Sequence, residues 1–87
     1  MLNFSFFLGV LNYELHLPIF LRAQVKMSMG IIDASEALPA FKESLDCLKK
    51  SLEHMRFERE GSFGFDLKNG AEQAHGQLKA FIQQLES

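Results

Sequence analysis

The clearest pattern along the chain is an apolar stripe between residues 33 and 57. Its apolar residues recur in steps of three and four, and charged residues fill the positions between them. This spacing predicts an amphipathic helix. Asp33 and Glu36 have the spacing of a capping box at its start, while Pro39 predicts either a small kink or a start closer to Leu38. The predicted apolar face consists of Leu38, Phe41, Leu45, Leu48, Leu52 and Met55.

A second stripe of the same period predicts a helix over residues 67–85. Asp66, or Asn69 paired with Glu72, is the expected N-cap of this helix. The segment 58–65, between the two helices, is expected to be a loop because it is short and rich in glycine.

The first third of the chain gives two conflicting signals. Residues 22–29 alternate strictly between polar and apolar, which is typical of a strand, whereas four apolar residues also recur in steps of four: Leu17, Leu21, Val25 and Met29. We predict a helix, because the residues are mostly good helix formers and the chain has no second convincing strand. Gly30 is expected to end this helix, and the short gap to Asp33 folds the next helix back. The expected fold is therefore all-α, a three-helix antiparallel arrangement.

Residues 1–11 form an apolar segment that resembles the core of a signal peptide. No Lys or Arg precedes its apolar run, and no Ala-x-Ala-like site follows. Glu14, His16 and Pro18 interrupt the run before it reaches the roughly 20 apolar residues of a membrane span. We therefore expect an apolar helix or a frayed end here. Residues 12–87 are expected to form a single helical domain or a fragment of a longer helical array.

The charges and the cysteine count narrow the classes of partner and compartment. The 87 residues carry nine Lys and Arg against eleven Asp and Glu, a net charge of -2, and the basic residues are scattered. A nucleic acid is not an expected partner, because binding it needs a concentrated basic face. The single cysteine, Cys47, is expected to be a small buried side chain in a reducing compartment. We expect a cytoplasmic or nuclear location rather than secretion.

Few residues suggest chemistry. His54 and Glu58 have a helical spacing that can share a metal ion, but two ligands do not make a site. Cys47 has no neighbour that would lower its thiol pKa, and Gly61 and Gly64 lack the Lys and the preceding strand of a phosphate-binding loop. We expect no catalytic residue, no metal and no cofactor.

Three phenylalanines at the predicted loop are the candidate contact residues for a partner. Phe57, Phe63 and Phe65 lie around Gly64 in a polar stretch. They either pack onto the helices or form an exposed apolar patch of the kind that marks an interface.

The chain resembles known helical proteins at two levels. Ala37 and Phe41 match the small residue and the aromatic residue of a tetratricopeptide-type helical hairpin. The region from Tyr13 to Leu85 resembles the C-terminal helical region of arthropod SET and MYND domain proteins, which are protein-lysine methyltransferases. The features that carry this resemblance are Glu36-Ala37-Leu38, the run from Leu52 to Glu58, Gly61-Ser62, and the run from Gly70 to Leu78.

The resemblance implies an accessory role and no catalysis. A proline expected shortly after Glu58 is Arg59 here, the zinc-ligand cysteines of the MYND module are missing, and the Asn-His-x-Cys segment of the SET domain is absent. We expect a noncatalytic protein-interaction segment whose partner is another protein or the remainder of a longer chain, without a membrane partner. We also expect it to self-associate, because so small a body cannot cover all of its apolar surface. The alternative is a small free-standing secreted or membrane-associated helical protein.

Overall fold

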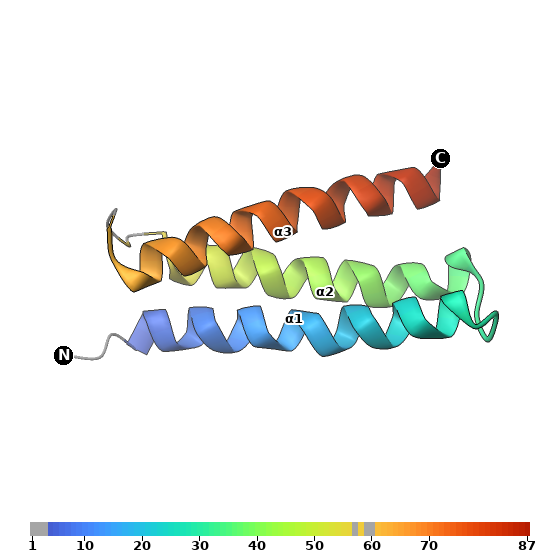
Figure 1. Cartoon of the computed structure of the whole chain (residues 1–87), viewed down its shortest axis with the longest axis horizontal. Coiled ribbons are helices and arrows are strands. Elements are labelled where there is room, and N and C mark those ends of the chain that lie inside the picture. Colours follow the sequence, from blue (N-terminus) through green and yellow to red (C-terminus); the bar gives the residue numbers. More distant parts are fainter. Residues whose placement is uncertain (1–3, 57, 59–60) are drawn as a thin grey trace.

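The computed structural model describes residues 4–56, 58 and 61–87, and it confirms the all-α, three-helix antiparallel fold (Figure 1). The helices are α1 (Phe4–Ser28), α2 (Ala34–His54) and α3 (Phe63–Glu86). In Figure 1, α2 lies between the other two, and α1 and α3 contact each other only slightly. The Cα atoms extend over 46 × 20 × 15 Å. The described residues therefore form an elongated layer of helices, and none of the other described helices lies on the far side of α1.

The contact between α1 and α2 repeats every seven residues, which is the heptad spacing of helices that pack side by side. Ser51 Oγ donates a hydrogen bond of 2.6 Å to the Gly9 carbonyl, and Ser44 Oγ donates one of 2.8 Å to the His16 carbonyl. A step of seven residues along one helix and seven back along the other leads from one pair to the next. The residues in this series are all buried: Gly9, His16 and Ala23 of α1, with Ala37, Ser44 and Ser51 of α2.

The small residues of this series let the two backbones lie close together. A Cβ atom built on Gly9 would stand 2.6 Å from Met55 Cγ and 3.2 Å from the Ser51 carbonyl oxygen. The same register places Ala23 opposite Ala37, and Ala37 is completely buried. Close approach of α1 and α2 therefore depends on residues that carry little or no side chain.

An aromatic cluster joins all three helices. The Phe41 ring of α2 lies 5.3 Å from the Phe20 ring of α1 and 5.2 Å from the Phe81 ring of α3, measured between centroids. Phe20 and Phe81 are themselves 6.2 Å apart. Phe41 is fully buried, as are Leu48 and Met55. The apolar stripe predicted for the second helix is thus the centre of the core.

The predicted signals at the junction of α1 and α2 are confirmed. The Asp33 carboxylate accepts the Glu36 N–H at 2.8 Å, and Glu36 Oε1 accepts the Asp33 N–H at 3.3 Å, which completes the capping box. Gly30 has a φ of 75°, and the Ile31 N–H donates back to the Lys26 carbonyl at 2.9 Å. This is the glycine-dependent C-terminal cap that the sequence predicted.

The helix boundaries around the second turn differ from the prediction. The second helix ends at His54 rather than at residue 57, and α3 begins at Phe63 rather than at residue 67. The N-cap is Ser62, whose Oγ accepts the Phe65 N–H at 3.0 Å, and not Asp66 or Asn69. Because Ser62 satisfies an N–H of the first turn, the helix extends through residues that were expected to form a loop.

The glycine that suggested a loop at this point has a packing role instead. A Cβ atom on Gly64 would stand 2.5 Å from Glu58 Oε2 and 2.9 Å from Phe6 Cε2. Because this position has no side chain, it leaves room for the side chains of Phe6 and Glu58 at the start of α3.

Helix α1 is continuous through the boundary expected between residues 11 and 12. The predicted helix over the first third is confirmed, but its step-of-four residues, Leu17, Leu21, Val25 and Met29, are exposed rather than packed on α2.

Candidate functional site

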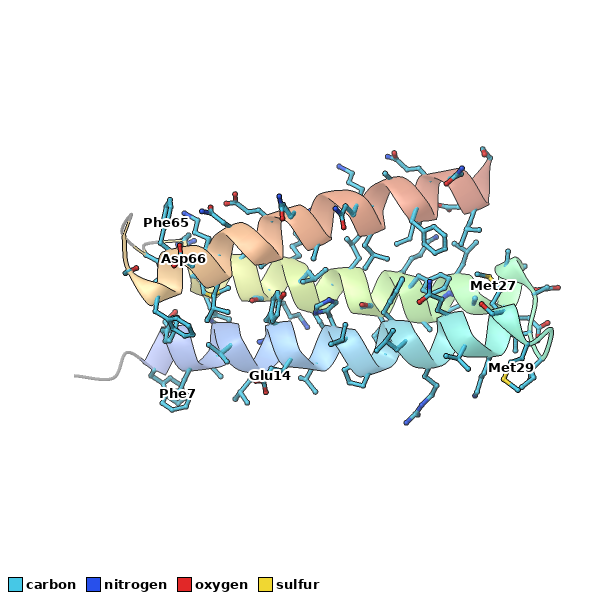
Figure 2. All side chains as sticks on the ribbon, viewed as in Figure 1. Phe7, Glu14, Met27, Met29, Phe65 and Asp66 are labelled. Atoms are coloured by element: carbon cyan, nitrogen blue, oxygen red, sulfur yellow. The ribbon has the colours of Figure 1, made fainter. Side chains whose placement is uncertain are left out.

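The side of α1 that points away from α2, here called the outer face, is both apolar and exposed. Figure 2 shows Phe7 and Glu14 extending from α1 away from α2. Its large apolar side chains are 45–75% exposed. The outer face consists of Phe4, Phe7, Leu11, Glu14, Leu15, Pro18, Leu21, Arg22, Val25 and Met29.

This face is unusual because a surface helix normally places polar side chains toward solvent. Helix α2 follows that rule, with Lys42, Glu43 and Asp46 on its exposed side. Helix α1 instead has an apolar seam against α2 and a second apolar face opposite to it. A helix that is apolar on all sides is usually covered by protein or by lipid.

Only two charged residues interrupt the outer face. Glu14 and Arg22 are both exposed and lie four residues before and four residues after Pro18, while Lys26 lies at the edge of the face. Among the described residues, neither Glu14 nor Arg22 forms an ion pair. The ion pairs that the structure shows join Lys42 to Glu86 and Lys50 to Asp46, away from this face.

By length and composition, α1 is also apolar enough to cross a membrane. Core helices of soluble proteins and signal sequences have the same property. In this structure α1 is packed along α2, and only 11% of its most apolar 18-residue stretch is buried. The exposed remainder of this stretch is therefore apolar in the way expected of a surface that another molecule covers.

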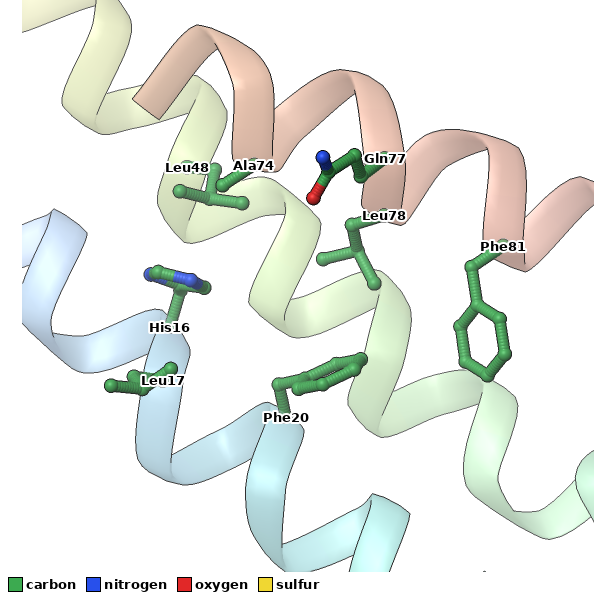
Figure 3. Close-up of a pocket in the computed structure, with 8 residues that line it drawn as sticks. All are labelled: His16, Leu17, Phe20, Leu48, Ala74, Gln77, Leu78 and Phe81. Atoms are coloured by element: carbon green, nitrogen blue, oxygen red, sulfur yellow. The ribbon is translucent and has the colours of Figure 1, made fainter. Parts of the chain in front are cut away.

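A shallow groove of about 320 Å³ lies over α2, between α1 and α3 (Figure 3). Its walls are mostly apolar, with His16 and Gln77 as the polar members. The Nδ1 atom of His16 is hydrogen-bonded to the Tyr13 carbonyl oxygen, so this ring nitrogen already has a partner. The groove can hold a small apolar group, and it is lined by His16, Leu17, Phe20, Leu48, Ala74, Gln77, Leu78 and Phe81.

The structure places the three predicted contact phenylalanines as follows. Phe57 lies outside the described residues. Phe63 is 73% exposed, and Phe65 is half-buried, with Lys68 Nζ 5.9 Å from its ring centroid. The two residues are two positions apart on the helix, so their side chains point in directions that differ by about 200° around its axis. Phe63 and Phe65 therefore do not form one patch.

The structure shows the surroundings of Cys47 and His54, two of the residues considered for chemistry. Burial, together with the neighbouring carboxylates of Glu43 and Asp46, raises the pKa of the Cys47 thiol, so the unreactive thiol form is favoured. Near His54, Ser5 Oγ lies 3.4 Å from the Nδ1 atom and donates to the backbone carbonyl at 3.0 Å. Within residues 4–56, 58 and 61–87, no three potential metal ligands come together.

In comparisons with known proteins, no family model, curated protein or solved structure matches the chain. The candidate site therefore depends on the geometry alone. Sequence reasoning missed the outer face, although a signal was present. Residues 4–29 contain more apolar positions than a single helix face can hold.

Proposed function

We propose that this chain is a noncatalytic helical segment that binds a protein surface through the outer face of α1. The observation that carries the proposal is the run of exposed large apolar side chains along the whole length of α1. Covering a half-exposed leucine or phenylalanine contributes on the order of 1 kcal/mol. A partner that covers most of this face therefore gains enough for specific binding.

The two charges on the face favour protein over lipid as its cover. Moving Glu14 or Arg22 to the centre of a bilayer costs about 2.5–3.5 kcal/mol each on insertion scales. A protein surface can instead offer an opposite charge to each of them. Entry into a membrane would also separate α1 from Ser44 and Ser51, which donate hydrogen bonds to its backbone.

The resemblances found in the sequence are consistent with this proposal. We propose that α1 and α2 form a tetratricopeptide-like hairpin, in which Ala37 allows close approach and Phe41 fills the adjoining layer. Both side chains are fully buried. The proposed role is that of the accessory helical region of a SET and MYND domain protein, with a cytoplasmic or nuclear location.

Site-specific photocrosslinking tests the proposal. A benzoylphenylalanine placed at Leu15, on the outer face, is compared in living cells with one at Lys49, on the exposed polar side of α2. We expect the Leu15 probe to give a reproducible adduct with one identified protein, which is lost when Leu11 is also changed to Asp. Adducts with lipid only, or equal labelling from both positions, would contradict the proposal.

Membrane association is a second candidate function, favoured by the length and apolar character of α1. It predicts that the purified chain floats with neutral phosphatidylcholine vesicles in a density gradient. Leu11→Asp would reduce this flotation, and Lys49→Asp would not. A chain that stays in the soluble fraction at every lipid concentration excludes this candidate.

A further inference from the structure

Between residues 7 and 29, the outer face of α1 is symmetric about Pro18. Glu14 and Arg22 are equally far from Pro18, on either side of it. The large apolar residues form pairs at equal distances in the same way, with Leu15 and Leu21, Leu11 and Val25, and Phe7 and Met29. When such a helix is turned end for end about Pro18, apolar positions fall on apolar positions and each charge falls on its opposite.

We propose that two copies of this chain associate through their outer faces, with the two α1 helices antiparallel and a two-fold axis at Pro18. Glu14 of each copy then lies opposite Arg22 of the other, so one contact forms two ion pairs. Two-fold symmetry makes the interface self-complementary, which closes the assembly as a dimer. This inference rests on the proposed function and names the partner as a second copy.

The area of the face agrees with what a stable dimer needs. With the axis at Pro18, residues 8–28 of α1 overlap in the two copies, a length of about 31 Å, and the outer half of a cylinder of that length and about 10–12 Å wide has an area of roughly 550 Å². Two copies would bury about 1,100 Å², which exceeds the roughly 1,000 Å² expected of a biological interface.

Neither of the other two described helices covers the outer face. Helices α2 and α3 both lie on the other side of α1 (Figure 1), so a second copy meets neither of them. The apolar residues also recur in steps of three and four, as Leu11, Leu15 and Pro18 illustrate. That spacing suits side-by-side helices at a small crossing angle of about 20°.

Charge reversal tests the pairing, with sedimentation equilibrium of the purified full chain as the measurement. In the Glu14→Arg variant, each introduced arginine lies opposite Arg22 of the other copy, so both ion pairs become pairs of positive charges. In the Arg22→Glu variant, each introduced glutamate lies opposite Glu14 of the other copy, so both become pairs of negative charges. We expect each single variant to raise the dimer dissociation constant by about 10-fold or more, because like charges across an interface are strongly disfavoured. The double variant Glu14→Arg/Arg22→Glu restores opposite charges and should return the constant to within about 3-fold of the original.

A matched control is Glu72→Arg, which reverses an exposed charge on α3 and should leave the dissociation constant unchanged. Circular dichroism of every variant confirms that it is folded. The inference is contradicted by a chain that stays monomeric up to about 1 mM, by single variants that behave like Glu72→Arg, or by a double variant that fails to recover. A monomer that still gives a Leu15 adduct with another protein would refute this inference alone, whereas adducts with lipid only would refute the proposed function as well.

Discussion

The replacement Phe41→Ala should remove more stability than any other single truncation in the core. Phe41 is completely buried, and its ring lies between Phe20 and Phe81, so one side chain links all three helices. Truncation of a buried phenylalanine typically costs about 3–5 kcal/mol, through lost burial and the cavity that remains. The two aromatic contacts place this site at the upper part of that range. A domain of this size has a total stability of about 4–13 kcal/mol.

Urea unfolding followed by circular dichroism, at one fixed chain concentration, measures this effect. With a denaturant slope of about 1–2 kcal/mol per molar urea, a loss of about 4 kcal/mol lowers the midpoint by about 2–4 M. The control is Lys42→Ala, one position along on the exposed side, where the ion pair with Glu86 is solvated. We expect a change there within about 0.5 kcal/mol. Equal midpoints for the two variants would refute the placement of Phe41 between the helices.

Three further predictions concern single positions. Ala37→Leu should cost about 1–3 kcal/mol in urea unfolding, because it forces α1 and α2 apart, whereas the exposed Ala80→Leu should be nearly neutral. Gly30→Ala should lower the free energy of unfolding by about 1–2 kcal/mol, because the φ of 75° at this position suits glycine. Gly76→Ala, at a position with open space and no positive φ, should instead raise it by up to about 1 kcal/mol. Changes of the same sign in the two variants would contradict this. The raised pKa of Cys47 means that less thiolate is present at a given pH. The rate of labelling by iodoacetamide should therefore rise with pH later in the folded chain than in the same chain unfolded in urea. Identical pH dependence of the two rates would contradict this.

The sequence was sufficient to predict the elements that depend on local signals. The apolar stripe around Phe41 and Leu48, the capping box at Asp33 and the left-handed Gly30 each act within a few residues of chain, and the structure contains all three. The start of α3 was misplaced because Gly64 was interpreted as a loop residue. Glycine occurs at this position because of tertiary packing, since Phe6 and Glu58 occupy the space that a side chain would need.

The outer face of α1 was missed for a related reason. A step of four, as in Leu21, Val25 and Met29, identifies a helix but does not say which of two apolar faces packs against a neighbour. In α1 the packing face instead mixes small or polar residues, such as Gly9 and His16, with a few large ones such as Phe20. Sequence patterns weight large apolar residues most heavily, so they favoured the face that the structure leaves exposed.

The distance between two spin labels tests most directly the claim that α1 is an interface between two copies. The label is attached at Ser28→Cys, at the exposed end of α1, in a chain whose Cys47 is replaced by Ser, and pulsed electron double resonance gives the separation. Antiparallel pairing about Pro18 places the two labels 20 residues apart along the helices, a distance of about 31 Å once the spacing between the helix axes is included. A parallel pair would give less than about 20 Å, because both labels would then lie at the same level. That shorter distance, or no defined distance at all, would contradict the account.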